Sequence, residues 1–205
     1  MRSPDSKAPT KRKLLEAAQQ LMLAKGFPAT TLDEICAAAG VTKGSFFHYF
    51  AGKEDLGKAV LEHFMGGRFQ AMQAAPFLKK RDPLERVYGY VDFVIKMSKD
   101  PSTLQGCLLG SFAQELSDTH PKIREQCGHY FDQWAAALKR DLDAAKAEYA
   151  PRATFDTQSL SEHFIVVIEG ALILVKAKQD GKILGKQLRH FKCYLQSLFE
   201  GRALR

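Results

Sequence analysis

The sequence of 205 residues lacks the features that mark membrane proteins and structural metal sites. Its longest apolar stretch, Phe164 to Val175, is interrupted by Glu169 and is too short to cross a bilayer. The four cysteines stand far apart, with no CxxC pair and no histidine cluster at metal-ligand spacing; they are Cys36, Cys107, Cys127 and Cys193. We therefore expect no membrane association and no bound metal.

Catalytic motifs are also missing. The sequence has no GxGxxG, P-loop, GxSxG or HExxH motif, and its six histidines are scattered along the chain. We therefore expect neither an enzyme nor a cofactor. Residues 1–13 are polar and basic, unlike a secretory signal peptide, so we expect reduced cysteines and a cytoplasmic location.

The composition is that of an ordinary folded protein with an excess of positive charge. Hydrophobic residues make up 45% and charged residues 26% of the chain, and the net charge is +7. This charge favours a polyanionic partner such as DNA, RNA or an anionic membrane surface. It does not locate the binding surface, because residues 176–205 are more basic than residues 1–58, and we interpret that C-terminal excess as a solvated helix face.

The spacing of apolar residues predicts an all-α protein. Leu14, Leu15, Ala18, Leu21 and Met22 share one face of a first helix, which should end near Gly26. No stretch shows the apolar and polar alternation of a strand. We predict further helices from residue 53 towards Pro76, from Pro83 to Asp100, over 104–116, from Pro121 onwards, over 156–179 and over 184–199.

A helix-turn-helix pattern occupies Thr31 to Leu56. Thr31 and Glu34 have the spacing of a capping box, in which each side chain bonds the other residue's backbone N–H. Gly40 suits a tight turn, and Thr42 should cap a second short helix through Tyr49. In such a motif the second helix can enter the major groove of DNA, so double-stranded DNA is the expected partner.

The same segment resembles the signature of TetR-type transcriptional repressors. The matching residues are Thr31, Ile35, Ala39-Gly40-Val41, Lys43 to Phe50, Lys53-Glu54 and Leu56. The resemblance implies a nine-helix TetR-like fold and a homodimer built on the last two helices. It also implies a palindromic operator, and release of DNA when a small-molecule or electrophile inducer binds. On this basis we expect a basic arm at 1–9, a DNA-binding domain at 10–58, and a ligand-binding and dimerisation domain at 59–205.

The resemblance also implies which residues contact DNA. These residues are Thr31, Thr42, Lys43, Gly44, Ser45, His48, Tyr49 and Lys53. Phe47 departs from the pattern, because many members have a phosphate-contacting tyrosine there, and its ring should pack against sugar or core instead. We expect Phe46 and Phe50 to lie in the core.

The helix expected at 156–179 is apolar over more than one face. Leu160, Phe164, Val167, Ile168 and Ile173 cover a wide arc, so this helix needs partners on two sides. An intersubunit four-helix bundle meets that need, and so does a central position in a monomeric bundle.

A small-molecule pocket inside the larger domain would be lined by aromatic residues and methionines. The candidates are Phe69, Phe93, Met97, Phe112, Trp134 and Phe164, with Met72 beside them. Each alone is more typical of core, and together they favour an apolar or planar ligand.

Cys107 stands between Gly106 and Gly110, where small residues allow close approach. A buried inert thiol and a reactive sensor both fit, since reactivity requires a nearby cation or helix N-terminus. The segments 105–115 and 169–176 resemble the electrophile-responsive branch of the family, typified by the repressor of N-ethylmaleimide reductase. That resemblance implies a sensing role for Cys107 with Lys176 as its partner, and we expect the other three cysteines to be structural.

Two other functions remain open from the residues themselves. A sequence-independent architectural DNA protein would also be basic and dimeric, and a helical bundle can host catalysis.

Overall fold

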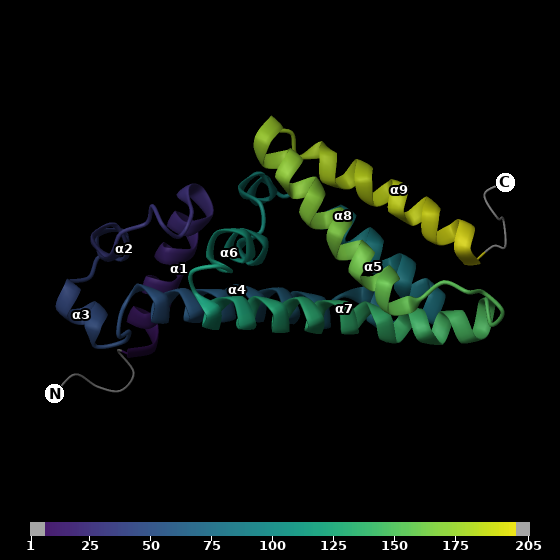
Figure 1. Cartoon of the computed structure of the whole chain (residues 1–205), viewed down its shortest axis with the longest axis horizontal. Coiled ribbons are helices and arrows are strands. Elements are labelled where there is room, and N and C mark those ends of the chain that lie inside the picture. The colour runs from purple at the N-terminus through teal and green to yellow at the C-terminus, as the bar shows by residue number, and fades with distance from the viewer. Residues whose placement is uncertain (1–6, 200–205) are drawn as a thin grey trace. The chain divides into compact units, whose positions relative to one another are not determined.

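The computed structural model describes residues 7–199, and helices account for nearly all of its regular structure. The first helices are α1 (Lys7–Lys25), α2 (Leu32–Ala39), α3 (Lys43–Phe47) and α4 (Lys53–Gln73). They are followed by η2 (Pro76–Lys79), α5 (Pro83–Met97), η3 (Pro101–Gln105), α6 (Leu108–Leu116), α7 (Pro121–Tyr149), α8 (Thr157–Lys178) and α9 (Lys182–Phe199), where η marks a short 3₁₀ helix. Figure 1 shows these elements, and between residues 7 and 199 the nine predicted α-helices are confirmed with no strand.

Two predicted helix boundaries are wrong. The helix expected at 104–116 is split into η3 and α6, because Gly106 has a φ of +86°, which an α-helix cannot contain. The second helix of the predicted motif ends at Phe47 rather than Tyr49, and His48 follows it as the C-terminal cap. Of the expected basic arm, residues 1–6 lie outside the described residues, and α1 begins at Lys7.

The chain packs as two compact units. The first unit comprises the described residues up to Gln70 together with Cys107–Gly128, and the second comprises Ala71–Gly106 together with the described residues from His129 onwards. Helices α4 and α7 each continue from one unit into the other. These two units are defined by packing and not by function. The predicted boundary at residue 58 between a DNA-binding domain and a ligand-binding domain therefore stays a prediction.

The core of the first unit forms where α1, α2, α4 and α6 meet. Leu14 of α1, Ile35 of α2, Leu56 of α4 and Leu109 of α6 are all fully buried. Phe46 and Phe50 are also buried, which confirms the prediction that both belong to the core. Burial of these apolar side chains provides the main stabilisation of the unit and fixes the place of α3.

The second unit has an aromatic core between α5, α7, α8 and α9. Tyr90 of α5 accepts a hydrogen bond from Trp134 Nε1 of α7 at 2.7 Å, and its ring lies 5.2 Å from that of Phe164 of α8. Phe164 in turn packs on Phe191 of α9, with ring centroids 5.3 Å apart. An ion pair between Arg86 and the buried Asp141 joins α5 to α7, with 2.9 Å between Nε and Oδ1.

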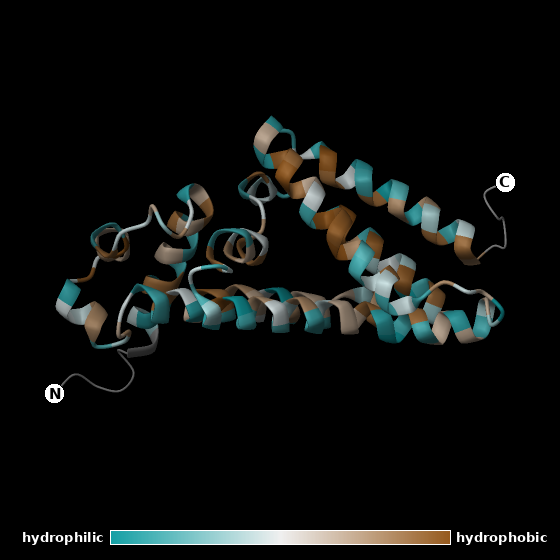
Figure 2. Cartoon of the chain, viewed as in Figure 1, coloured by the Kyte–Doolittle hydropathy of each residue, from teal (hydrophilic) through white to brown (hydrophobic). Residues whose placement is uncertain are grey.

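Helices α8 and α9 run side by side in the second unit (Figure 1). Asp156 caps the start of α8 by accepting a hydrogen bond from Ser159 N, and Gln179 ends the helix in the left-handed conformation. The apolar residues of α8 form a broad band in Figure 2, as its sequence pattern predicts.

Candidate nucleic-acid interface

The turn between α2 and α3 is built as the sequence pattern predicts. Thr31 and Glu34 form the capping box, in which each side chain accepts a hydrogen bond from the other residue's backbone N–H. Gly40 ends α2 with a φ of +65°, a conformation that glycine adopts without strain. Thr42 then caps α3 by accepting a hydrogen bond from Ser45 N at 3.1 Å. These contacts fix the direction in which α3 leaves the turn.

Helix α3 has a buried side and an exposed side. Phe46 and Phe50, four residues apart, point into the core. Gly44, Phe47 and His48 are exposed. Because the buried side anchors the helix, the exposed side is presented to solvent as a fixed surface, which is what groove recognition requires.

The eight predicted DNA-contacting residues lie on or next to this surface. Five of them are exposed: Thr31, Thr42, Lys43, Gly44 and His48. The other three are half-buried: Ser45, Tyr49 and Lys53. The rings of His48 and Tyr49 meet edge to face with centroids 5.4 Å apart. Their contact with DNA stays a prediction.

Lys43 forms an ion pair with Asp33 across the turn. The Nζ atom lies 2.7 Å from Oδ1, and the hydrogen bond to Asp33 raises the pKa of Lys43 above its usual value. Both side chains are largely exposed, so solvent weakens the pair. Sequence reasoning missed Asp33, because it singled out only groups that attract phosphate.

For the Phe47 ring we predicted packing against either DNA sugar or the core, and the structure decides between them in part. Its side chain is 56% exposed, so the expectation that it packs in the core is wrong. Phe46 within α3 and Phe50 just after it fill the buried positions, and residue 47 falls on the exposed side. Contact with DNA sugar stays a prediction.

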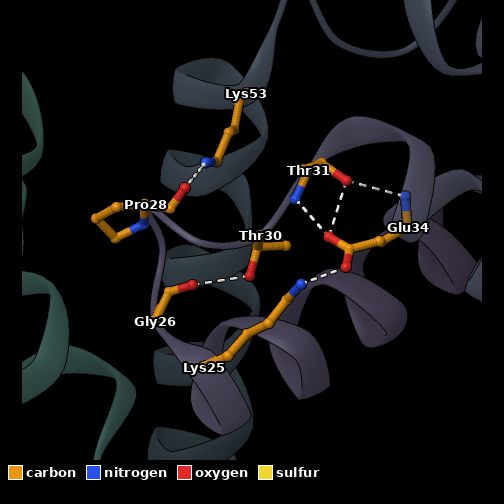
Figure 3. Close-up of polar contacts among 7 residues, drawn as sticks. All are labelled: Lys25, Gly26, Pro28, Thr30, Thr31, Glu34 and Lys53. Carbon is orange, nitrogen blue, oxygen red and sulfur yellow. Dashed lines mark hydrogen bonds and ion pairs between the residues drawn. The ribbon is translucent and has the colours of Figure 1, made fainter.

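Lys53 is held by the loop between α1 and α2, as Figure 3 shows. Its Nζ atom donates a hydrogen bond to the carbonyl oxygen of Pro28 at 3.1 Å and lies 4.5 Å from the ring centroid of Phe27. Partial burial and the nearby Lys25 lower its pKa. The expected phosphate contact therefore has to compete with, or add to, this bond within the protein.

The loop also receives support from α1 and from its own residues. In Figure 3, Thr30 donates a hydrogen bond to the carbonyl of Gly26 at 2.7 Å, and Lys25 contacts the carboxylate of Glu34. The bonds from Lys25 and Thr31 lower the pKa of Glu34 to about 2. A charged Glu34 therefore ties the end of α1 to the first turn of α2 at neutral pH.

The predicted pocket residues do not form one group. Phe112 belongs to the first unit, where it is buried against Phe27 with ring centroids 5.6 Å apart. Trp134 and Phe164 meet through Tyr90 in the core of the second unit. The others are more accessible: Phe69, Met72 and Phe93 are half-buried and Met97 is exposed. A pocket lined by these residues stays a prediction.

Cys107 is buried at the N-terminal cap of α6. A helix N-terminus is one of the two surroundings that can make a thiol reactive. Lys176 lies close to the preceding residue, because a Cβ atom on Gly106 would be 3.9 Å from Lys176 Cδ. The pairing of Lys176 with Cys107 itself stays a prediction.

The other cysteines differ from one another. Burial raises the pKa of the Cys127 thiol to about 11, and burial and Asp33 raise the pKa of the Cys36 thiol. Both thiols are therefore kept protonated at neutral pH, as expected of structural cysteines. Cys193 is exposed on α9 and is not part of the core.

An exposed apolar strip lies on α8. Its members are Val166, which is 64% exposed, Ile173 and Leu174, and Tyr194 of α9 is exposed as well. Leu160, Phe164 and Ile168 on the other side of α8 are buried within the chain. The wide apolar arc predicted from sequence thus has one side covered and one side open in the single chain.

Within residues 7–199, no three histidine, cysteine, aspartate or glutamate side chains come together in a way that would hold a metal ion. No helix in this part of the chain has the length and apolar character needed to span a membrane.

Two family models match most of the chain. The model described as "Bacterial regulatory proteins, tetR family" matches residues 14–60, which include α2, the turn and α3. The model described as "Tetracyclin repressor-like, C-terminal domain" matches residues 83–191, more than half of the chain.

Individual relatives agree with the family models. The chain is 30% identical to the HTH-type transcriptional repressor NemR of Escherichia coli (strain K12), covering 89% of this chain and 92% of NemR. It is 26% identical to the HTH-type transcriptional repressor DhaR of Mycobacterium sp. (strain GP1), covering 89% and 90% of the two chains.

Solved structures agree in fold. The crystal structure of E. coli NemR in its reduced form superposes with a TM-score of 0.73 at 25% identity, covering 89% of this chain and 95% of that one. A regulatory protein TetR from Rhodobacter sphaeroides superposes with a TM-score of 0.77 at 27% identity, covering 88% and 95%.

Proposed function

The chain belongs to the TetR family of bacterial regulatory proteins, and we propose that it is a transcriptional repressor that binds a palindromic operator as a homodimer. The observation that carries this proposal is the exposed side of α3. There Gly44, Phe47 and His48 face solvent over a helix anchored by Phe46 and Phe50. NemR and DhaR are both named repressors, which supports repression rather than activation of transcription.

DNA binding would combine base contacts from α3 with phosphate contacts around it. His48, Tyr49 and Ser45 can offer hydrogen bonds to base edges or phosphates, and the exposed Lys43 can exchange Asp33 for a phosphate. Thr31 and Thr42 stand at helix starts, where backbone N–H groups favour an anion. Lys53 would contact phosphate from the loop side.

Two copies of α3 would be brought to one operator by dimerisation through α8 and α9. The strip of Val166, Ile173 and Leu174 supports this assignment, because burying it against the same strip of a second copy removes apolar area from water. An isologous interface of this kind gives the two-fold symmetry that a palindrome requires.

Release of the operator would follow modification of Cys107 by an electrophile. In this step the thiolate sulfur adds to the β-carbon of an α,β-unsaturated carbonyl compound, and the proton lost from the thiol ends on the α-carbon. Cys107 has only 4% of its surface exposed, so an adduct must displace packed neighbours at the start of α6. Lys176, which the family resemblance pairs with Cys107, would favour the thiolate through its positive charge. The likeness to NemR supports this assignment.

An electrophoretic mobility shift with DNA from around the protein's own gene tests the proposal. We expect one duplex to bind at least about a thousandfold more tightly than unrelated DNA at the same salt concentration. Equal binding to all duplexes would favour an architectural protein and would contradict the repressor assignment.

The sensor assignment needs its own comparison. Treatment with N-ethylmaleimide should release the operator from the wild type and from Cys193→Ser, in which the exposed thiol is absent. The Cys107→Ser variant should bind DNA normally and resist release. Release of Cys107→Ser at the wild-type dose would show that another residue is the sensor.

A further inference from the structure

Phe47 is an isolated apolar side chain on a surface that is otherwise polar. In the part of the first unit that the structure describes, it is the only large hydrophobic side chain that is exposed; the others are on the second unit. A partner that covered this ring would remove its apolar area from water, which is favourable. The ring therefore favours a partner that offers an apolar group.

The Phe47 ring has one aromatic neighbour. It packs edge to face on Phe46, with ring centroids 5.3 Å apart and an interplanar angle of 89°. Phe46 is fully buried and cannot move without disturbing the core. This contact limits the positions of the Phe47 ring, which reduces the conformational entropy lost when it meets a partner.

The surroundings of the ring allow close approach. Gly44 lies three residues earlier on the same side of α3 and presents no side chain. Packing does not demand a glycine there, because a Cβ atom would meet only Thr42 Oγ1, at 3.8 Å. The space above Gly44 is therefore open beside Phe47, and an incoming surface can approach the backbone of α3.

The Phe47 ring itself cannot bond a phosphate, because a phenyl ring offers no hydrogen-bond donor. Among the base edges of the major groove, the C5 methyl group of thymine is the feature that makes apolar contacts with side chains such as phenylalanine.

We infer that Phe47 is a specificity-determining residue that packs on the C5 methyl group of one thymine in each half-site of the operator. The inference rests on the proposed function and deepens it, because it names one base and one atom of the recognised sequence. Gly44 provides the room for this approach, and Phe46 holds the ring in place.

Replacing thymine with deoxyuridine tests the inference, since this removes the C5 methyl group and leaves the hydrogen-bonding edge unchanged. The probe is the tightest duplex selected by the wild-type protein from random DNA, with each symmetry-related pair of thymines replaced in turn. Replacement of one particular thymine pair should weaken binding by about fourfold per methyl group, or roughly 15-fold for the pair. This value follows from the free energy of burying a methyl-sized group. The Phe47→Ala variant should bind the thymine and deoxyuridine duplexes equally.

His48→Ala is the matched control, because His48 is the exposed residue next to Phe47 in the chain. It should bind more weakly overall and keep the full sensitivity to deoxyuridine. A thermal unfolding midpoint like that of the wild type shows that each variant is folded, as expected for changes at exposed side chains.

The possible results separate two failures. If no duplex is selected by the wild type, the proposed DNA-binding function itself is wrong. If a duplex is selected but no thymine pair shows the methyl effect, or if Phe47→Ala keeps the effect, the protein binds DNA and the assignment of Phe47 to a thymine methyl group is overturned. Contact of the ring with sugar alone would give the second result.

Discussion

The carboxylate of Glu115 on α6 accepts a hydrogen bond from the backbone N–H of Phe27, with 2.8 Å between Oε2 and N. Gly26 makes room for this contact: its φ is +85°, and a Cβ atom there would lie 2.9 Å from Glu115 Oε1. The Phe27 ring packs on Phe112, which is also on α6, and the ammonium group of Lys53 of α4 lies over the Phe27 ring. The loop that leads into α2 is therefore joined to α6 within the first unit.

Removing the Glu115 carboxylate should destabilise the first unit. In Glu115→Ala the partly buried N–H of Phe27 loses its partner, so we expect the free energy of unfolding to fall by about 1–2 kcal/mol. Chemical denaturation measures this change. Glu115→Gln keeps an acceptor and should lose less.

Glu125→Ala on α7 is the control, because this exposed glutamate lies in the same unit. It should leave the free energy of unfolding within about 0.5 kcal/mol of the wild-type value. If Glu115→Ala and Glu125→Ala lower the free energy of unfolding equally, the hydrogen bond to Phe27 does not stabilise the unit, and the effect comes from the loss of a negative charge alone.

The local features of the interface were predictable from sequence because their partners are close in the chain. The capping box joins residues three apart, and the glycine turn at Gly40 depends on one residue's own conformation. The bond from Lys53 to Pro28 spans 25 residues and the one from Phe27 to Glu115 spans 88. Such contacts depend on how helices pack, and no local pattern encodes them.

Gly106 shows a second limit. The apolar spacing over 104–116 fits one helix, but the positive φ of this glycine separates η3 from α6. A glycine inside a helical pattern either stays helical at a modest cost or ends the helix, and the choice depends on tertiary contacts. Phe47 is similar, since its exposure follows from the burial of Phe46 and Phe50 rather than from its own apolar character.

Gly44→Ala should separate DNA binding from stability. A Cβ atom fits at this position, and alanine has a higher helix propensity than glycine. The midpoint of thermal unfolding should therefore stay constant or rise. The added methyl group would occupy the space beside Phe47, and we expect operator affinity to fall by about tenfold.

Gly128→Ala on α7 is the matched substitution, because a Cβ atom there meets nothing within 4 Å. It should raise the midpoint in the same way and leave operator affinity unchanged. Unchanged affinity in Gly44→Ala as well would mean that α3 does not approach DNA closely at this point.

The lowered pKa of Glu34 predicts a specific dependence of stability on pH. The folded-state pKa of about 2 lies below the usual value of 4.5, because Lys25 and Thr31 bond the charged form. The charged carboxylate therefore stabilises the fold above about pH 4.5, and this contribution is lost as the pH falls through 2.

Glu34→Gln keeps the capping geometry but cannot pair with Lys25 as an anion. The difference in free energy of unfolding between the wild type and Glu34→Gln should be largest near pH 6 and shrink towards pH 2. Denaturation curves at a series of pH values measure it. A difference that does not change with pH would show that the charge on Glu34 is unimportant.

The open strip on α8 gives the last prediction. A glutamate at position 166 would place a charge in the interface that the exposed Val166 and Ile173 are proposed to form, and burying an unpaired charge is costly. Val166→Glu should therefore behave as a monomer in analytical ultracentrifugation at concentrations where the wild type is a dimer. Because one subunit covers only half of a palindrome, operator binding should fall at least about a hundredfold. Met97→Glu changes an exposed apolar residue of α5, outside the proposed interface, and should remain dimeric. A dimeric, operator-binding Val166→Glu protein would place the interface elsewhere on the molecule and leave the wide apolar arc of α8 without the partner that we assign to it.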